Sequence, residues 1–117
     1  MLVNDIHSQL NPTRVARVLK PSGLTALVDV VRAAAAAGAR LSICGGRHAM
    51  GGQQYGTDTW LVDMCDHAAV HSLDEETGVL VADAGILWPD LIQGCAMLHR
   101  PAVKHGESVR NKPAQTD

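Results

Sequence analysis

The chain has 117 residues, of which 46% are hydrophobic and 19% are charged, and its formal net charge is −2 at pH 7. This length and composition are typical of one globular domain with a small core. The near-neutral charge gives no electrostatic reason to expect nucleic acid or an anionic membrane as a partner. No apolar run is long enough to span a bilayer, and the first twelve residues lack the pattern of a signal peptide, so we expect a cytoplasmic protein. The three cysteines, Cys44, Cys65 and Cys95, are widely spaced, and we expect them to be reduced and mostly buried.

The first elements follow the order strand, helix, strand. Residues 15–19 alternate apolar and polar side chains, as expected of a short strand. From Leu24 to Ala37 apolar residues recur every three or four positions, which predicts a helix with Ser22 as its N-terminal cap and Gly38 as its stop. We expect its buried face to contain Leu24, Leu27, Val28, Val31, Ala34 and Ala35. A second short strand is predicted over 40–44.

The second half of the chain predicts more strands and a second helix. Residues 60–64 are typical of a strand, and residues 69–84 indicate a hairpin whose turn is Asp74–Gly78. Pro89 then marks the first turn of a helix over 88–98.

This order of elements predicts an α/β (α+β) fold. The strands near Val15, Leu41 and Trp60 should form a small parallel sheet with the first helix as its crossover, and the hairpin should begin a second, antiparallel lobe. Because aromatic residues are few, we expect Trp60 and Trp88 to anchor the core. Residues 99–117 are polar and contain two prolines, so we expect a domain over 1–98 followed by a disordered tail.

A glycine-rich loop follows the strand 40–44, with the sequence ICGGRHAMGGQQ over residues 43–54. Glycines allow sharp turns that direct successive backbone N–H groups to one point, which suits the oxygens of a phosphate or pyrophosphate. The spacing differs from the G-x-G-x-x-G pattern, and no acidic residue is placed to hold a ribose. The loop therefore disfavours a nicotinamide-binding Rossmann unit.

In the order of its parts the sequence resembles the FAD-binding domain of the vanillyl alcohol oxidase and p-cresol methylhydroxylase flavoproteins, the PCMH-type domain. The resemblance extends from about Pro12 to Leu98. It rests on the helix TALVDVVRAAAAAG, the strand LSIC, the loop GGRHAMGG, the strand WLVDM and the hairpin ending VLVADAGILWPDL. It implies that FAD is the cofactor and that backbone amides of the loop bind its pyrophosphate. The residues implied are Gly45, Gly46, Arg47, His48, Ala49, Met50, Gly51 and Gly52. In several members the flavin is attached covalently through the histidine of this loop, which corresponds to His48.

The resemblance further implies an FAD-dependent oxidoreductase in which a hydride passes from the substrate to flavin N5. A complete member continues with more flavin contacts and a substrate domain, so we expect this chain to be the front part of such an enzyme, without its C-terminal substrate domain. The alternative is a non-catalytic truncated remnant that binds flavin weakly or not at all. Many members have Gly before the loop histidine and Ser after it. Here Arg47 and Ala49 stand in those places, so a hydroxyl is lost and a cation is gained.

Alternatives stay open for individual side chains. His48 is either the flavin attachment point or a histidine that hydrogen-bonds a neighbour or a phosphate, and Arg47 is either a pyrophosphate contact or a solvated charge. A zinc site is conceivable from four residues that lie close in sequence: Asp63, Cys65, His67 and His71. It is disfavoured, because the residues are distributed across a predicted strand end and turn, where i, i+4 spacing does not place both imidazoles on one face.

Overall fold

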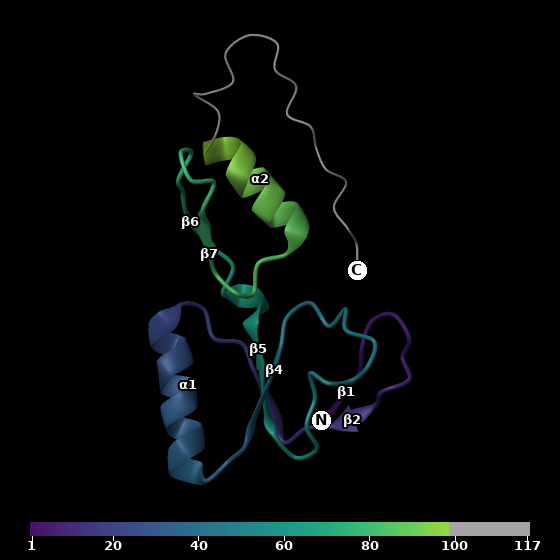
Figure 1. Ribbon diagram of the computed structural model, residues 1–117. Helices are drawn as coiled ribbons and strands as arrows, with labels where there is room; N and C mark the ends of the chain where they lie inside the picture. Colours follow the sequence, from purple (N-terminus) through teal and green to yellow (C-terminus); the bar gives the residue numbers. More distant parts are fainter. Residues whose placement is uncertain (99–117) are drawn as a thin grey trace.

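The computed structural model describes residues 1–98, which form two lobes joined by a short neck (Figure 1). In chain order the elements are β1 (Leu2–Val3), β2 (Thr13–Arg14), β3 (Arg17–Leu19), α1 (Leu24–Ala37), β4 (Leu41–Cys44), β5 (Trp60–Asp63), the 3-10 helix η1 (Met64–Asp66), β6 (Val70–Leu73), β7 (Leu80–Ala82) and α2 (Trp88–Leu98). The neck is η1, which lies between the lobes. The tail predicted over 99–117 lies outside the described residues.

The first lobe is built on a three-stranded parallel sheet in the order β3-β5-β4. The predicted parallel sheet with α1 as its crossover is therefore confirmed. In β5, the central strand, Leu61 and Val62 are almost completely buried. Such burial on both faces is typical of a parallel strand covered on each side.

Helix α1 begins and ends at glycines. Its N-cap is Gly23, and no side chain caps it, so the prediction of Ser22 as the cap is wrong. Ser22 lies one residue too early, because Gly23 takes the positive φ of 88° that redirects the chain into the helix. Gly38 ends the helix with a left-handed φ of 62°, as predicted.

The predicted buried face of α1 is wrong in part. Ala34 is 1% exposed and Leu27 is half-buried, whereas Leu24 is 69% and Val31 is 47% exposed. Ala35 is exposed as well. Apolar residues occur around most of this helix, so their periodicity could not select the narrow stripe that faces the sheet.

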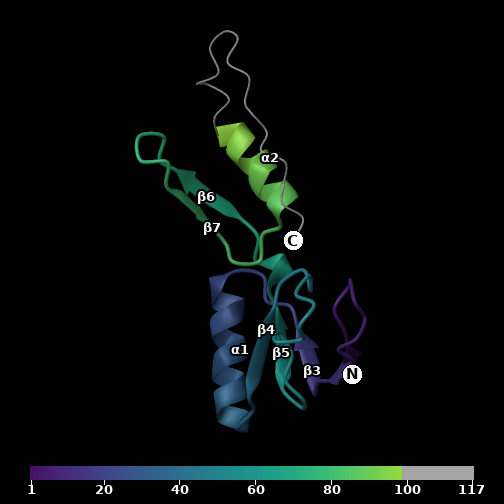
Figure 2. The same ribbon diagram turned by 45° about the vertical axis from the view of Figure 1, so that its right-hand side comes forward.

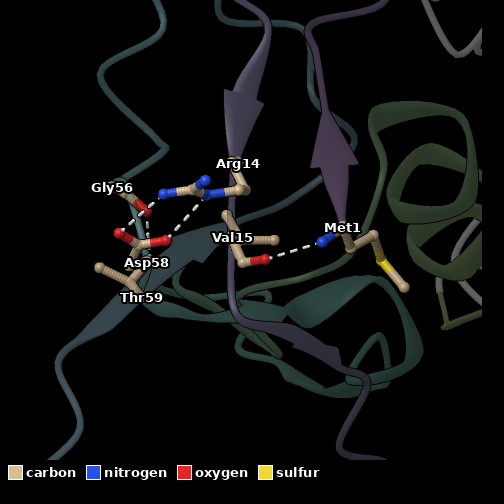
Figure 3. A network of polar contacts seen from close by, with 6 residues as sticks. All are labelled: Met1, Arg14, Val15, Gly56, Asp58 and Thr59. Carbon is tan, nitrogen blue, oxygen red and sulfur yellow. Dashed lines mark hydrogen bonds and ion pairs between the residues drawn. The ribbon is translucent and has the colours of Figure 1, made fainter.

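The N-terminal segment lies on the other side of the sheet from α1 (Figure 2). Its strands β1 and β2 form an antiparallel pair that the sequence did not predict. A core cluster on this side contains Val3, Val15, Cys44 and Leu61. The segment is also tied by its end, because the Met1 ammonium group donates a hydrogen bond to the Val15 carbonyl at 3.0 Å (Figure 3).

The second lobe consists of the β6–β7 hairpin and α2, as predicted. In the turn, the Gly78 N–H donates to the Asp74 carbonyl at 2.7 Å. Helix α2 approaches β6 closely at Gly94, where an added Cβ would lie 2.7 Å from Val70 Cγ2. The expected core role of Trp88 is wrong, because its side chain at the start of α2 is 62% exposed.

Two further expectations concern Trp60 and the cysteines. Trp60 is half-buried, and the Arg17 guanidinium lies 4.2 Å from the centre of its ring. All three cysteines are free, but only Cys44 is fully buried. Within residues 1–98, neither helix is long and apolar enough to cross a membrane.

Candidate functional site

The glycine loop leaves the carboxyl end of β4 and returns to the start of β5. The eight predicted site residues, 45–52, all lie on it. Ligands of parallel sheets commonly bind beyond the carboxyl ends of the strands, so this is a suitable position for a binding loop. The loop also approaches the second lobe, because a Cβ added to Gly46 would lie 3.0 Å from Leu87 Cδ2, just before α2.

Two carbonyl groups of the loop are held by the N-terminal segment. The Arg47 carbonyl accepts a hydrogen bond from the Ile6 N–H at 3.1 Å, and the Met50 carbonyl accepts one from Asn11 Nδ2 at 2.6 Å. Within the described part of the chain all peptide bonds are trans, so each carbonyl points opposite to the N–H of the next residue. The amides of His48 and Gly51 are therefore directed away from the N-terminal segment.

The backbone amide groups of the loop differ from these carbonyls. Among residues 1–98, none accepts a hydrogen bond from the backbone N–H groups of residues 46–51. A run of unpaired backbone donors beside glycines is the arrangement that binds phosphate oxygens. The His48 and Gly51 amides, opposite the two held carbonyls, are therefore available to an anionic ligand.

The glycines differ in how much space surrounds them. A Cβ on Gly46 would lie 2.8 Å from His48 Cδ2, and a Cβ on Gly52 would lie 2.9 Å from the Asn11 side chain. Gly52 also has a φ of 71°. At Gly45 an added Cβ would meet nothing within 4 Å. Gly52 is thus the position where this loop requires glycine, and a side chain at Gly46 would displace the His48 ring.

Arg47 directs its charge into the protein. Its Nη2 lies 3.3 Å from Oδ2 of Asp63, which ends β5 and is 4% exposed. Lys20 Nζ lies 4.0 Å from the same oxygen. Burial alone would lower the pKa of Arg47, but its contacts with Cys44 and Asp63 outweigh burial and raise the pKa. The guanidinium therefore compensates a buried carboxylate and does not extend toward solvent.

Cys44, next to this ion pair, is not a candidate nucleophile. It lies at the end of β4 and is 3% exposed. Burial, together with the charge of Asp63, raises the pKa of its thiol. A protonated, buried thiol behaves as a small apolar side chain.

His48 is exposed and paired with a residue that the sequence analysis missed. Its Nδ1 lies 2.9 Å from His7 Nε2, and the two rings are tilted by 42° with their centres 5.1 Å apart. One nitrogen must donate and the other accept, so this contact engages Nδ1. His48 Nε2 is on the Gly46 side of the ring, 3.0 Å from where a Cβ of Gly46 would lie.

The residues considered for zinc take other roles. In the described part of the chain, no group of three or more His, Cys, Asp or Glu side chains has an arrangement that could hold a metal ion. Instead Asp83 Oδ1 lies 3.3 Å from His67 Nε2 and 2.6 Å from His71 Nε2. The hydrogen bond from His71, together with one from the Ala69 N–H, lowers the pKa of Asp83. These contacts fasten the hairpin to the neck and lie outside the glycine loop.

Comparison with protein families identifies the chain. The family described as "FAD binding domain" matches residues 15–102, well over half of the sequence. The comparison with curated proteins gives no match. The matched region contains the parallel sheet, the glycine loop and the hairpin. The chain therefore belongs to the FAD-binding domain family of the FAD-linked oxidases.

Proposed function

We propose that this chain binds FAD and that the loop 45–52 holds its pyrophosphate through backbone amides. The observation that carries the proposal is the difference between the carbonyl and the amide groups of the loop. Carbonyls of Arg47 and Met50 are bound by the N-terminal segment, while the amides of 46–51 have no acceptor in the described residues. Family membership supports FAD as the dinucleotide.

The proposed role is that of the cofactor-binding part of an FAD-linked oxidoreductase. Bound flavin supplies the redox chemistry, since its N5 accepts a hydride from a substrate carbon. The residues of this chain bind and orient the dinucleotide. Because Arg47 is engaged with Asp63, we propose that backbone dipoles, rather than this cation, provide the favourable field for the pyrophosphate.

We propose His48 as the attachment point if the flavin is bound covalently. Its Nδ1 faces His7, so Nε2 is the nitrogen left for attachment. Nε2 has a free lone pair only when His48 Nδ1 carries the proton and donates it to His7 Nε2. The competing role is a non-covalent contact with a neighbour or a phosphate.

The binding proposal is tested by titrating the purified full chain with FAD. Gly46→Val should weaken binding by about tenfold to a hundredfold, the loss expected for one charge-assisted hydrogen bond. Ala36→Val, at an exposed position of α1, also adds a β-branched side chain, is the matched control and should bind like the parent. Equal affinities for the Gly46 variant and the parent would remove the loop from the site.

The same titration tests the second candidate function, a remnant that binds flavin weakly or not at all. Bound flavin gives the protein visible absorbance, whereas such a remnant stays colourless after addition of FAD and gel filtration. Covalent attachment has its own readout. Parent protein precipitated with acid should keep its yellow colour in the pellet, and His48→Ala should release it. Complete release from the parent would leave His48 at most a contact.

A further inference from the structure

The N-terminal segment holds the glycine loop from outside the family match. Residues 4–11, which we call the strap, precede the matched region 15–102. The strap touches the loop at three places. They are the Ile6 N–H on the Arg47 carbonyl at 3.1 Å, the ring of His7 on the ring of His48, and Asn11 on the Met50 carbonyl.

The strap is organised by one buried carboxylate. Asp5 is 0% exposed, and its oxygens accept hydrogen bonds from the N–H groups of His7 and Ser8 at 3.2 and 2.6 Å. They also accept the Ser8 hydroxyl at 2.9 Å and Asn11 Nδ2 at 3.1 Å. Burial alone would raise the pKa of Asp5, but the hydrogen bonds from Asn11, Ser8 and Gln9 outweigh it and lower the pKa to about 2. The ionised Asp5 side chain, which we call the hub of the strap, therefore fixes the strap conformation through these hydrogen bonds.

Asn11 links this hub to the loop. Its side-chain amide donates both to Asp5 Oδ1 and to the Met50 carbonyl. A second link runs through Tyr55, at the far end of the loop, whose hydroxyl donates to the Asn4 carbonyl at 2.7 Å. The strap thus contacts the loop near its middle and near its end.

We propose that the strap positions the loop for the FAD pyrophosphate, with Asp5 and Asn11 as its positioning residues; this inference rests on the proposed function. A carbonyl held toward the strap turns the following N–H away from it, so the strap sets the direction of the His48 and Gly51 amides. Without it, the glycine-rich backbone samples many orientations, and binding must then order the loop.

The test uses the full chain with two variants, Asp5→Asn and Asn11→Ala. Each should weaken FAD binding by about tenfold, because the loop must be ordered at the expense of binding energy. Asp5→Asn removes a negative charge, which by electrostatics alone would favour the anionic cofactor. A loss of affinity in this variant therefore reports on positioning.

Trypsin cleavage, measured without FAD, tests the strap independently of the proposed function. In the parent, the strap protects the peptide bond after Arg47, so both variants should be cleaved there by trypsin about tenfold faster. Cleavage after Arg32, in α1, should be unchanged and shows that the first lobe stays folded. The matched control Gln93→Ala removes a carboxamide from an exposed position in α2 and should behave like the parent in both assays.

The outcomes are distinct. Faster cleavage after Arg47 with weaker FAD binding supports the strap. An unchanged cleavage rate, or unchanged affinity in both variants, overturns it. If the parent does not bind FAD, the proposed function has failed, and the cleavage rates alone decide whether the strap orders the loop. If cleavage after Arg32 rises equally, Asp5 and Asn11 stabilise the whole lobe and the positioning role is wrong.

Discussion

Gly85→Ala, in the segment between β7 and α2 that packs against the neck, should strongly destabilise the protein. Gly85 is buried, and its N–H donates to the His67 carbonyl at 3.0 Å. A Cβ at this position would overlap the Met64 carbonyl oxygen and would lie 2.8 Å from the His67 carbonyl oxygen. Both obstructing atoms belong to backbone, so no side-chain rotation can relieve the overlap.

The loss in free energy of unfolding depends on how far the backbone around Gly85 must shift. Overpacking in a rigid site costs about 1–3 kcal/mol, and a backbone obstruction places Gly85→Ala at the upper end of that range, about 3 kcal/mol. Shifting the chain also weakens the bond from the Gly85 N–H to His67, worth about 1 kcal/mol. A domain of this size has a free energy of unfolding of about 5–15 kcal/mol, so the variant should lose a large share of it.

The assay is urea denaturation followed by circular dichroism. A loss of about 3–4 kcal/mol should lower the urea midpoint by about 1.5–2 M at a slope of about 2 kcal/mol/M. Gly45→Ala is the matched control, because its added methyl meets nothing within 4 Å and its φ is not positive. A midpoint for Gly85→Ala equal to that of this control would refute the described packing of the neck.

Three further predictions concern the strap, the loop and α1. The pKa of Asp5 is lowered to about 2 from an ordinary 3.8. The ionised carboxylate therefore stabilises the fold fully above pH 3.8, and this stabilisation is lost as the pH falls toward 2. Between pH 5 and pH 2 the urea-denaturation midpoint of Asp5→Asn should fall less than that of the parent. Arg47 has a left-handed φ of 62°, so Arg47→Ala and Arg47→Gly both lose the ion pair with Asp63, but only Ala keeps the backbone strain. Arg47→Ala should therefore be less stable by about 1 kcal/mol in urea, and equal stabilities would contradict that strain. Ala34→Asp should lower the free energy of unfolding by about 3 kcal/mol or more, because it buries an unpaired charge. Val31→Asp, at an exposed position, should change it by about 0.5 kcal/mol. A lower melting temperature for Val31→Asp than for Ala34→Asp would mean that the sheet-facing residues of α1 are misassigned.

Most of the fold could be predicted because its elements have strong local signals. Gly38 ends α1 in a left-handed conformation, which glycine adopts without steric cost. The turn before Gly78 separates two alternating segments, so the hairpin was visible in the sequence. These elements could be predicted without knowing which residues pack against them.

The errors occurred where tertiary contacts decide. Trp88 is aromatic in an aromatic-poor chain, yet it starts a helix that is turned so that the side chain is exposed. The strap had no periodic pattern to indicate it, and its role depends on contacts across 39 residues from Asn11 to Met50 and 41 residues from His7 to His48. Only an Asn-Asp pair and an Asn-Pro pair, at Asn4 and Asn11, suggest turn chemistry there.

The departures of the loop from the family pattern have a physical explanation in this geometry. Where many members have Gly before the loop histidine, Arg47 adopts the left-handed φ that Gly would take freely, at a cost of about 1 kcal/mol. The cation offsets that strain by pairing with Asp63, a buried carboxylate whose other partners are the Cys65 N–H and the more distant Lys20. Loss of the hydroxyl at Ala49 leaves the backbone amides in place, since amide donors do not depend on the side chain that follows the histidine. The Ile6 N–H and the Asn11 side chain therefore hold two carbonyls of the loop, and the proposed anion site needs only the backbone amides that remain unpaired in the described residues.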